Sequence, residues 1–223
     1  MSKVIVVGEG KIADEIYHYL MNDSDHVIVA FSADKKYITN KTKFDLPVIP
    51  FEKIEITYPP DEYKMLVAIG YQQLNKLRTD KYLEAKKKGY SFISYISSKV
   101  SNLGNVNIGE NCIILENNTI NTTAKIGNNV ILWCGNHIGH HSIIEDNCFL
   151  AGQVVVSGVT KISAYCFIGV NATIGHQIVI GKKNIIGART LITKNTEENS
   201  VFISQDTEKF RLDSNTFLKL TKL

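Results

Sequence analysis

An aliphatic residue recurs at every sixth position through the second half of the chain, and this period constrains the fold more than any other feature. From Ile108 to Ile192, every sixth residue is Ile, Leu or Val, and seven of these residues are followed directly by glycine. A hexad of this kind is one short strand and one turn, and stacked hexads are typical of a parallel β-helix. Three hexads form one coil, so residues 108–197 supply five coils in which equivalent residues stack about 4.8 Å apart.

The residue four positions after each of these aliphatic residues is mostly small or β-branched. Cys112, Cys148 and Cys166 occupy this position, where a thiol behaves as a small hydrophobe. We therefore predict buried cysteines rather than a nucleophile. The four cysteines have no CxxC spacing, which argues against a zinc knuckle or a disulfide framework, and Cys134 lies on an outer face.

The first part of the chain follows a different pattern, in which strands alternate with helices. Apolar strands are predicted at 3–8, 26–32, 64–70 and 91–96, with helices at 11–22 and 71–89. Such alternation is typical of a small open α/β sheet. The change of pattern divides the chain into an α/β domain (1–96), a β-helix (97–198) and a tail (199–223).

The tail has the signature of a short terminal helix. Asp213 or Ser214 can cap it, and Phe217, Leu218 and Leu220 form its apolar side. We expect this tail to dock on the prism or on a neighbouring molecule.

Composition narrows the class of protein. Hydrophobic residues make up 44% and charged residues 21%, and the net charge of +3 is too small to favour nucleic-acid binding. The first residues, MSKVIVVG, form a strand that ends in a glycine turn, unlike a signal peptide, and no run approaches the ~18 apolar residues of a membrane span. We expect a soluble cytoplasmic protein with no nucleic-acid or membrane partner.

Three of the six histidines lie in the stretch HIGHHSIIEDNCFL, residues 137–150. His140 is third in its hexad, so Gly158 stacks on it one coil later and His176 two coils later. A base beside a glycine amide suits acyl transfer, because the base removes the proton of the nucleophile while the N–H stabilises the oxyanion. On stacking alone, a surface histidine without function is an equal alternative for His140 and His176, and it is favoured for His137.

The same column of histidines has an alternative interpretation as a metal site. Two strand spacings, roughly 10 Å, separate His140 from His176, too far for one zinc ion with Zn–N bonds of ~2 Å. Zinc shared between the subunits of a trimer stays open. We predict no metal site within one chain.

A glycine-rich turn follows the first predicted strand. Gly8-Glu9-Gly10-Lys11-Ile12-Ala13 matches GxGxxA, and the amides at the start of the following helix can bind phosphate. A dinucleotide site also requires an acidic residue at the end of the second strand, and Asp34 comes late for that role. A dehydrogenase is therefore the weakest interpretation.

Together, the two halves resemble the bacterial sugar acetyltransferases of the sialic-acid O-acetyltransferase/PglD-like group. The resemblance spans Lys3 to about Lys194 and rests on GHHSIIED (139–146), SGV (157–159) and FIGVNATI (167–174). It implies a small Rossmann-like domain followed by a left-handed β-helix, a homotrimer, and acetyl-CoA as cosubstrate in the groove between neighbouring prisms.

The resemblance also implies roles for individual residues. His140 would be the general base towards a sugar amine or hydroxyl, and the Gly158 N–H would hold the thioester oxygen. The acetyl-CoA candidates are Gly158, Gly169, Asn171, Ala172, His176, Gly187 and Ala188. The nucleotide of a nucleotide-linked sugar would bind to Gly8, Gly10, Lys11, Asp34 and Gly70. Arg78, in IGYQQLNKLR, either belongs to a family segment or is a solvated helix residue.

Three positions depart from the pattern of this family. An acidic residue usually follows the base, but this chain has His141, a further candidate catalytic residue, and Asp146 or Glu116 could take the place of the acid. Some members have a second histidine nine residues after the base, where this chain has Phe149. The tail replaces the usual ending of the family.

These observations predict an acetyl-CoA-dependent N-acetyltransferase that acts on a nucleotide-linked amino sugar in the biosynthesis of a surface glycan such as lipopolysaccharide. The amine would attack the thioester directly, with His140 as base. The alternatives that stay open are a sugar O-acetyltransferase, a longer-chain acyltransferase, a zinc-dependent β-helix lyase, and a nucleotide-sugar binder without catalysis.

Overall fold

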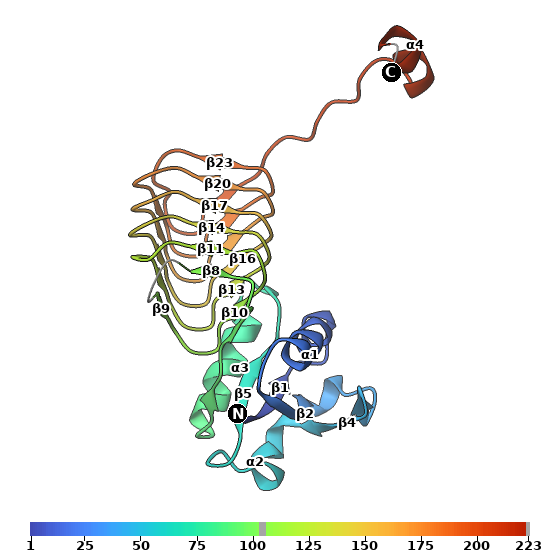
Figure 1. Ribbon diagram of the computed structural model, residues 1–223, viewed down its shortest axis with the longest axis vertical. Helices are drawn as coiled ribbons and strands as arrows, with labels where there is room; N and C mark the ends of the chain where they lie inside the picture. The colour runs from blue at the N-terminus through green and yellow to red at the C-terminus, as the bar shows by residue number, and fades with distance from the viewer. Residues whose placement is uncertain (103–105, 222–223) are drawn as a thin grey trace.

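The structure is a computed structural model that describes residues 1–102 and 106–221. An α/β part is followed by a three-sided prism of short strands and by a C-terminal tail (Figure 1). None of the helices in the described ranges is long and apolar enough to cross a membrane.

The α/β part contains one sheet with the strand order β3-β4-β2-β1-β5-β6. All neighbouring pairs are parallel except β3–β4, which is an antiparallel hairpin. The strands are β1 (Lys3–Val7), β2 (Val27–Ala33), β3 (Thr42–Lys43), β4 (Leu46–Pro50), β5 (Lys64–Val67) and β6 (Ser91–Phe92). The helical segments are α1 (Lys11–Asn22), η1 (Lys35–Tyr37), η2 (Phe51–Lys53), α2 (Ile54–Thr57) and α3 (Lys76–Lys87).

The predicted strands at 3–8, 26–32 and 64–70 and the predicted helices are present, although α3 begins only at Lys76, and the β3–β4 hairpin was missed. Its turn is made by Phe44 and Asp45, both with positive φ, in place of the glycine or asparagine that marks such turns in a sequence. In α1 the apolar period holds, because Ala13, Ile16 and Leu20 are buried against the sheet.

The second part is a left-handed parallel β-helix, as predicted. Its strands are two residues long and form three faces, which we name by their strand number. The seven-stranded face contains β7 (Tyr95–Ile96), β10 (Ile113–Ile114), β13 (Ile131–Leu132), β16 (Phe149–Leu150), β19 (Phe167–Ile168), β22 (Ile185–Ile186) and β24 (Val201–Phe202). The six-stranded face contains β8 (Ser101–Asn102), β11 (Thr119–Ile120), β14 (His137–Ile138), β17 (Val155–Val156), β20 (Thr173–Ile174) and β23 (Leu191–Ile192). The five-stranded face contains β9 (Asn107–Ile108), β12 (Lys125–Ile126), β15 (Ile143–Ile144), β18 (Lys161–Ile162) and β21 (Val179–Ile180).

The hexad period explains the core of the prism. The aliphatic residues from Ile114 to Ile192 point inward and are almost fully buried, and Cys112, Cys148 and Cys166 are buried beside them as predicted. Successive strands of a face pair at an offset of eighteen residues, for example His137 with Val155, except that β22 pairs with β24 at an offset of sixteen. Most of the turns contain one residue with positive φ, such as Asn129, His141 and Val159.

The segment 91–96 was predicted as one strand, and this is wrong. Ser91 and Phe92 pair with β5 of the α/β sheet, whereas Tyr95 and Ile96 pair with β10 of the prism. The prism therefore begins before Ile108, and the chain passes from one part to the other within three residues.

The α/β part packs on the first coils of the seven-stranded face. Outward side chains of this face, including Ile113, Ile131 and Phe149, share one apolar cluster with Ile16 and Leu66 of the α/β part. The ring of Tyr71 lies against Phe149 and Phe167, with centroids 5.1 Å and 4.5 Å apart. Phe149 therefore serves the contact between the two parts.

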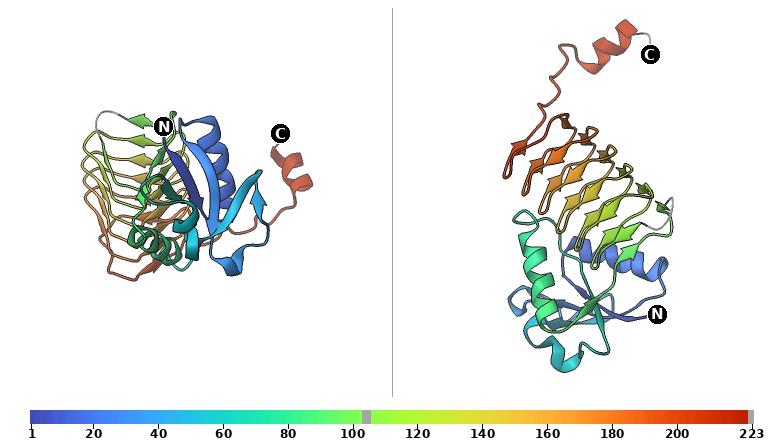
Figure 2. Two further views of the ribbon diagram at one scale, coloured as in Figure 1. Left: turned by 90° about the horizontal axis from the view of Figure 1, so that it is seen from below. Right: turned by 90° about the vertical axis from the view of Figure 1, so that its left-hand side faces the viewer.

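The tail forms the predicted helix but does not dock on its own prism. In α4 (Ser214–Thr221) no residue is buried, and Asp213 accepts hydrogen bonds from the amides of Asn215 and Thr216. Figures 1 and 2 show α4 separated from the prism by an extended linker without regular secondary structure. The expectation of docking on its own prism is wrong, because Phe217, Leu218 and Leu220 stay exposed.

Candidate functional site: a histidine edge and an α/β pocket

The histidine stretch lies on one edge of the prism. His140 and His141 are in the turn between β14 of the six-stranded face and β15 of the five-stranded face. We call this edge, with His140, Gly158 and His176 stacked along it, the histidine edge. It is opposite the seven-stranded face, on which the α/β part packs.

The imidazole of His140 covers the backbone of Gly158. A Cβ at Gly158 would lie 2.5 Å from Nε2 of His140 and 2.7 Å from Cε1, so only glycine lets the ring take this position. Among the described residues, none accepts a hydrogen bond from the Gly158 N–H. One edge therefore brings together an exposed base and a backbone donor, the pair that acyl transfer requires.

The residue that contacts Nδ1 of His140 is His141 and not an acid. The two Nδ1 atoms are 3.1 Å apart, and Nδ1 of His141 is also 3.2 Å from the hydroxyl of Thr123. Asp146 instead accepts a hydrogen bond from the amide of Asn128, and Glu116 accepts one from the hydroxyl of Tyr19. The suggestion that either acid takes the place of the missing one is therefore wrong, and no pattern in the sequence pointed to Thr123.

His176 lies closer to His140 than strand spacing alone implied. The ring centroids are 6.2 Å apart rather than roughly 10 Å, and the ring of His140 lies over the small Gly158 between them. His137 is on the six-stranded face with its side chain exposed. Within residues 1–102 and 106–221, no three His, Cys, Asp or Glu side chains form a group that could hold a metal ion.

The candidates for acetyl-CoA contact fall on two edges of the prism. Gly158 and His176 belong to the histidine edge. The others lie in turns between the seven-stranded and six-stranded faces, namely Gly169, Asn171 and Ala172 after β19, and Gly187 and Ala188 after β22. One prism does not bring these two groups together, since the six-stranded face separates them.

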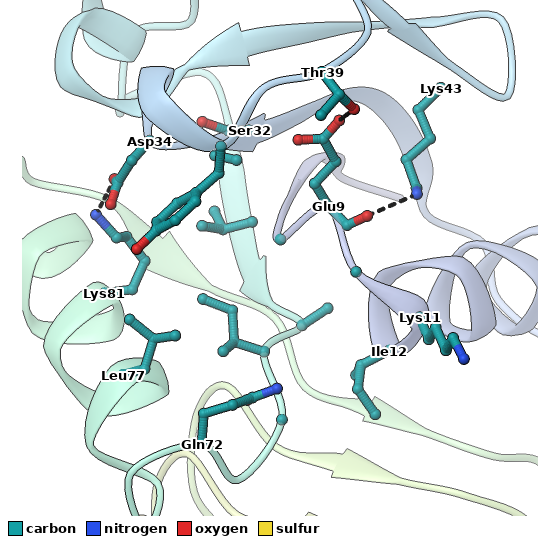
Figure 3. A pocket seen from close by; sticks show the side chains of 18 of the residues that line it. Glu9, Lys11, Ile12, Ser32, Asp34, Thr39, Lys43, Gln72, Leu77 and Lys81 are labelled. Atoms are coloured by element: carbon teal, nitrogen blue, oxygen red, sulfur yellow. Dashed lines mark hydrogen bonds and ion pairs between the residues drawn. The ribbon is translucent and has the colours of Figure 1, made fainter.

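A pocket of about 820 Å³ opens in the α/β part, where β1, β2 and β5 end near the start of α1 (Figure 3). All five candidates for nucleotide-sugar binding line it: Gly8, Gly10, Lys11, Asp34 and Gly70. The carboxyl ends of parallel strands beside a helix N-terminus are a common place for phosphate-bearing ligands.

The two glycines of the turn have different roles. Gly8 has a φ of +140°, and a Cβ there would lie 2.6 Å from the carbonyl oxygen of Ala68. Gly10 has extended backbone and caps α1 without a side-chain hydrogen bond, and a Cβ there would meet nothing within 4 Å. Gly8 is therefore required by the fold, whereas Gly10 leaves open space in front of the free amides of α1.

Charged side chains that the sequence analysis missed line the same pocket. Lys81 of α3 forms ion pairs with Asp34 at 2.5 Å and with Glu84 at 2.7 Å. Burial by itself lowers the pKa of Lys81, but these two carboxylates raise it above its ordinary value. On the opposite wall, Lys43 donates a hydrogen bond to the carbonyl oxygen of Glu9 (Figure 3). The pocket thus contains cations held by the fold, although no local motif marks them.

Arg78 is fully buried, so its interpretation as a solvated helix residue is wrong. Its guanidinium donates hydrogen bonds to the carbonyl oxygens of Gly70, Asn129 and Cys148 at 3.1–3.2 Å. Burial lowers the pKa of Arg78 to about 10, so it stays charged at neutral pH. Because Gly70 lines the pocket and Cys148 belongs to the prism, Arg78 connects the pocket wall to the β-helix.

Comparisons with known proteins agree with this architecture. Residues 123–158 match the family model described as bacterial transferase hexapeptide (six repeats). A mutant of perosamine N-acetyltransferase from Caulobacter crescentus, in complex with CoA and GDP-perosamine, is similar with a TM-score of 0.80 and 20% identity over 92% of this chain and 94% of that chain. The acetyltransferase domain of PglB from Neisseria gonorrhoeae has a TM-score of 0.79 and 19% identity over 92% and 97% of the two chains. WeeI from Acinetobacter baumannii has a TM-score of 0.77 and 21% identity over 92% and 97%.

These likenesses establish the fold. The chain has the architecture of hexapeptide-repeat transferases in which an α/β part precedes a left-handed β-helix. The resemblance to bacterial sugar acetyltransferases that GHHSIIED, SGV and FIGVNATI indicated is confirmed at this level over most of the chain.

Proposed function

We propose that this protein is an acetyl-CoA-dependent N-acetyltransferase of a nucleotide-linked amino sugar. The observation that supports this most is the stacking of His140 on Gly158, which places a base beside a backbone N–H. The similarity to a perosamine N-acetyltransferase in complex with CoA and GDP-perosamine supports the same class of donor and acceptor. The glycan pathway and a cytoplasmic location belong to this proposal.

In the proposed reaction, the amine of the sugar attacks the thioester carbonyl of acetyl-CoA. Nε2 of His140 accepts the proton of the amine, and the N–H of Gly158 stabilises the oxyanion of the tetrahedral intermediate. The intermediate then collapses, CoA leaves as a thiolate, and the thiolate takes up the proton held by His140 to become the thiol. This route needs no covalent enzyme intermediate, and the cysteines of the β-helix core, Cys112, Cys148 and Cys166, are buried.

The nucleotide part of the acceptor would bind in the α/β pocket. The free amides at the start of α1 suit a phosphate, and Gly10 leaves room for it. Lys11 and Lys43 add positive charge at this end of the pocket, where Lys43 also pairs with Asp14.

The protein would act as a homotrimer, because one chain does not assemble a complete site. The α/β pocket lies beside the seven-stranded face, and His140 lies on the opposite edge. The two groups of acetyl-CoA candidates are likewise on different edges. A groove between neighbouring prisms would bring the histidine edge of one subunit close to the α/β pocket of the next. It would also bring it close to the edge between the seven-stranded and six-stranded faces of that subunit.

The first test is thiol release from acetyl-CoA with a panel of UDP-, dTDP- and GDP-linked amino sugars. We expect turnover on one amino sugar and a fall of ~10² or more for His140→Asn. His137→Asn is the matched control, because it changes an exposed histidine three residues away on the six-stranded face. No turnover on any sugar, with sugar binding retained, would instead support a binding protein, and turnover unaffected by His140→Asn would place the base elsewhere.

A second test addresses the shared site. A subunit with His140→Asn and a subunit with Gly10→Asp would each lack one half of the site. Co-expressed mixed trimers should regain part of the activity, since some grooves combine two intact halves. If every mixed trimer stays inactive while each variant folds and the wild type is active, the site lies within one chain.

A further inference from the structure

We propose that the uncharged imidazole of His141 selects the tautomer of His140 that can act as a base, and that His141 is thereby a positioning residue in place of an acid. This inference rests on the proposed function. It starts from the contact between the two Nδ1 atoms at 3.1 Å, in which one nitrogen must donate and the other must accept.

The direction of this hydrogen bond decides whether His140 can act as a base. Nε2 of His140 is the nitrogen over Gly158, so it faces the place where the amine and the thioester would react. It can take a proton only if the ring carries its own hydrogen on Nδ1. In that case His140 donates from Nδ1 and Nδ1 of His141 accepts.

The hydroxyl of Thr123 is compatible with this direction. Its hydroxyl oxygen already accepts the backbone N–H of His141 at 2.8 Å, so its own hydrogen is left to donate. The same hydroxyl is 3.2 Å from Nδ1 of His141. When the hydroxyl donates to Nδ1, this nitrogen stays an acceptor, and the hydrogen of His141 lies on Nε2. The single lone pair of Nδ1 is then shared between the hydrogens of Thr123 and His140.

The electrostatic surroundings of His140 distinguish this arrangement from a histidine–acid pair. The titratable groups that face it are His141 in its own turn and His176 at 6.2 Å, and Lys194 follows in the same column. In the described part of the chain, no carboxylate forms a hydrogen bond or ion pair with His140 or His141. An acid would stabilise the imidazolium form of the base, whereas a neutral partner orients the ring without doing so.

The backbone suits a short polar residue at position 141. His141 has a φ of +57°, the left-handed conformation that Asn and Asp adopt readily. Asn can accept the Nδ1 hydrogen of His140 without charge, Asp can accept it with a negative charge, and Ala cannot accept it. These three substitutions separate orientation from charge.

The experiment compares pH profiles of kcat/KM for His141→Ala, His141→Asn and His141→Asp. Ala should lower kcat about 10- to 100-fold with little change in KM, and Asn should restore most of the loss. Asp should move the acidic limb of the profile to higher pH by about half a unit to one unit, because a carboxylate beside an imidazole stabilises its protonated form. Gln177→Asp is the matched control, since it adds the same charge at a left-handed position of the same edge, two coils away.

Nuclear magnetic resonance of ¹⁵N-histidine-labelled protein without substrates gives an independent readout. We expect His140 to carry hydrogen on Nδ1 and His141 on Nε2 at neutral pH. This result would stand even if no acetyl transfer were found, so failure of the proposed function can be told apart from failure of this inference. Any of three results would overturn the inference. They are a hydrogen on Nε2 of His140, full activity of His141→Ala, and a pH profile of His141→Asp whose acidic limb does not move.

Discussion

Nε2 of His140 lies so close to Gly158 that a Cβ at position 158 would be 2.5 Å from it. The contact involves the end of an exposed side chain, so an added methyl group can push the ring aside while the backbone stays in place. The glycine is therefore needed by the base rather than by the fold of the coil.

Gly158→Ala should lower kcat by ~10² or more while leaving thermal stability nearly unchanged, because it moves the base and crowds the backbone donor. Gly152→Ala is a suitable control, since a Cβ there would meet its nearest neighbour, the carbonyl oxygen of Cys134, at 3.4 Å. Thiol-release assays measure kcat of both variants, and melting curves measure their thermal stability. A Gly158→Ala protein with full activity would contradict the placement of the reacting atoms over this glycine.

Gly10→Asp should weaken nucleotide-sugar binding and leave the protein at least as stable as before. An aspartate at the N-cap can accept hydrogen bonds from the free amides of α1, and this stabilises the helix by about 0.5–1 kcal/mol. The same carboxylate would occupy and repel the phosphate site. Titration calorimetry and urea unfolding should show a rise in Kd of ten-fold or more without a loss of stability.

Gly10→Asn is the control for the charge at this position, because it caps the helix without a negative charge. We expect it to weaken binding less than Gly10→Asp does. Equal binding by the wild type and by both variants would mean that the ligand does not reach the start of α1.

Arg78→Met should lower the free energy of unfolding by about 3–5 kcal/mol, because it leaves buried carbonyl groups of Gly70, Asn129 and Cys148 without a charged donor. Lys76→Met, on the exposed side of the same helix, should change it by less than about 0.5 kcal/mol. Urea unfolding of both variants tests this. A small effect of Arg78→Met would show that apolar contacts alone hold the two parts together.

Asp23 gives a pH-dependent contribution to stability. Hydrogen bonds from Ser98, Tyr95 and Ser97 lower the pKa of this carboxyl to about 2, against the effect of burial. Because the pKa is lower in the folded state, the stabilisation is present above about pH 4 and is lost as the pH falls from 4 towards 2.

Asp23→Asn should therefore cost about 1 kcal/mol at pH 7 and progressively less between pH 4 and pH 2, since the partly exposed carboxylate is screened by solvent. Asp25→Asn changes an exposed carboxyl two residues away and should have little effect at any pH. Urea unfolding at pH 7, 4 and 3 measures the difference. A cost for Asp23→Asn that is constant over this range would contradict the low pKa.

Much of this architecture is readable from the sequence because it is repetitive or local. The spacing from Ile108 to Ile192 predicts the prism, since every sixth side chain must point inward when each hexad is one strand and one turn. The stacking of His140, Gly158 and His176 follows from the same repeat, since three hexads form one coil. The turn at Gly8 and Gly10 lies between a strand and a helix, and its place beside the pocket needs only that context.

Other features depend on contacts between residues far apart in the chain. Nothing near Arg78 in the sequence shows that it is buried against Cys148, and nothing near Lys81 shows that it pairs with Asp34 across the pocket. The partner of His140 depends on side-chain conformations that the sequence does not specify. Here His141 contacts both His140 and Thr123. Asp146 and Glu116 accept hydrogen bonds from other groups.

By itself, the sequence determined the coil, its inward residues and the two regions that contain the candidate chemistry, because periodicity and turn geometry are local properties of the chain. Only the tertiary structure decided that the α/β part covers the seven-stranded face and leaves the histidine edge on the opposite side. That choice arises from apolar packing of Tyr71 and α1 on Phe149 and its neighbours, a contact that no local pattern specifies.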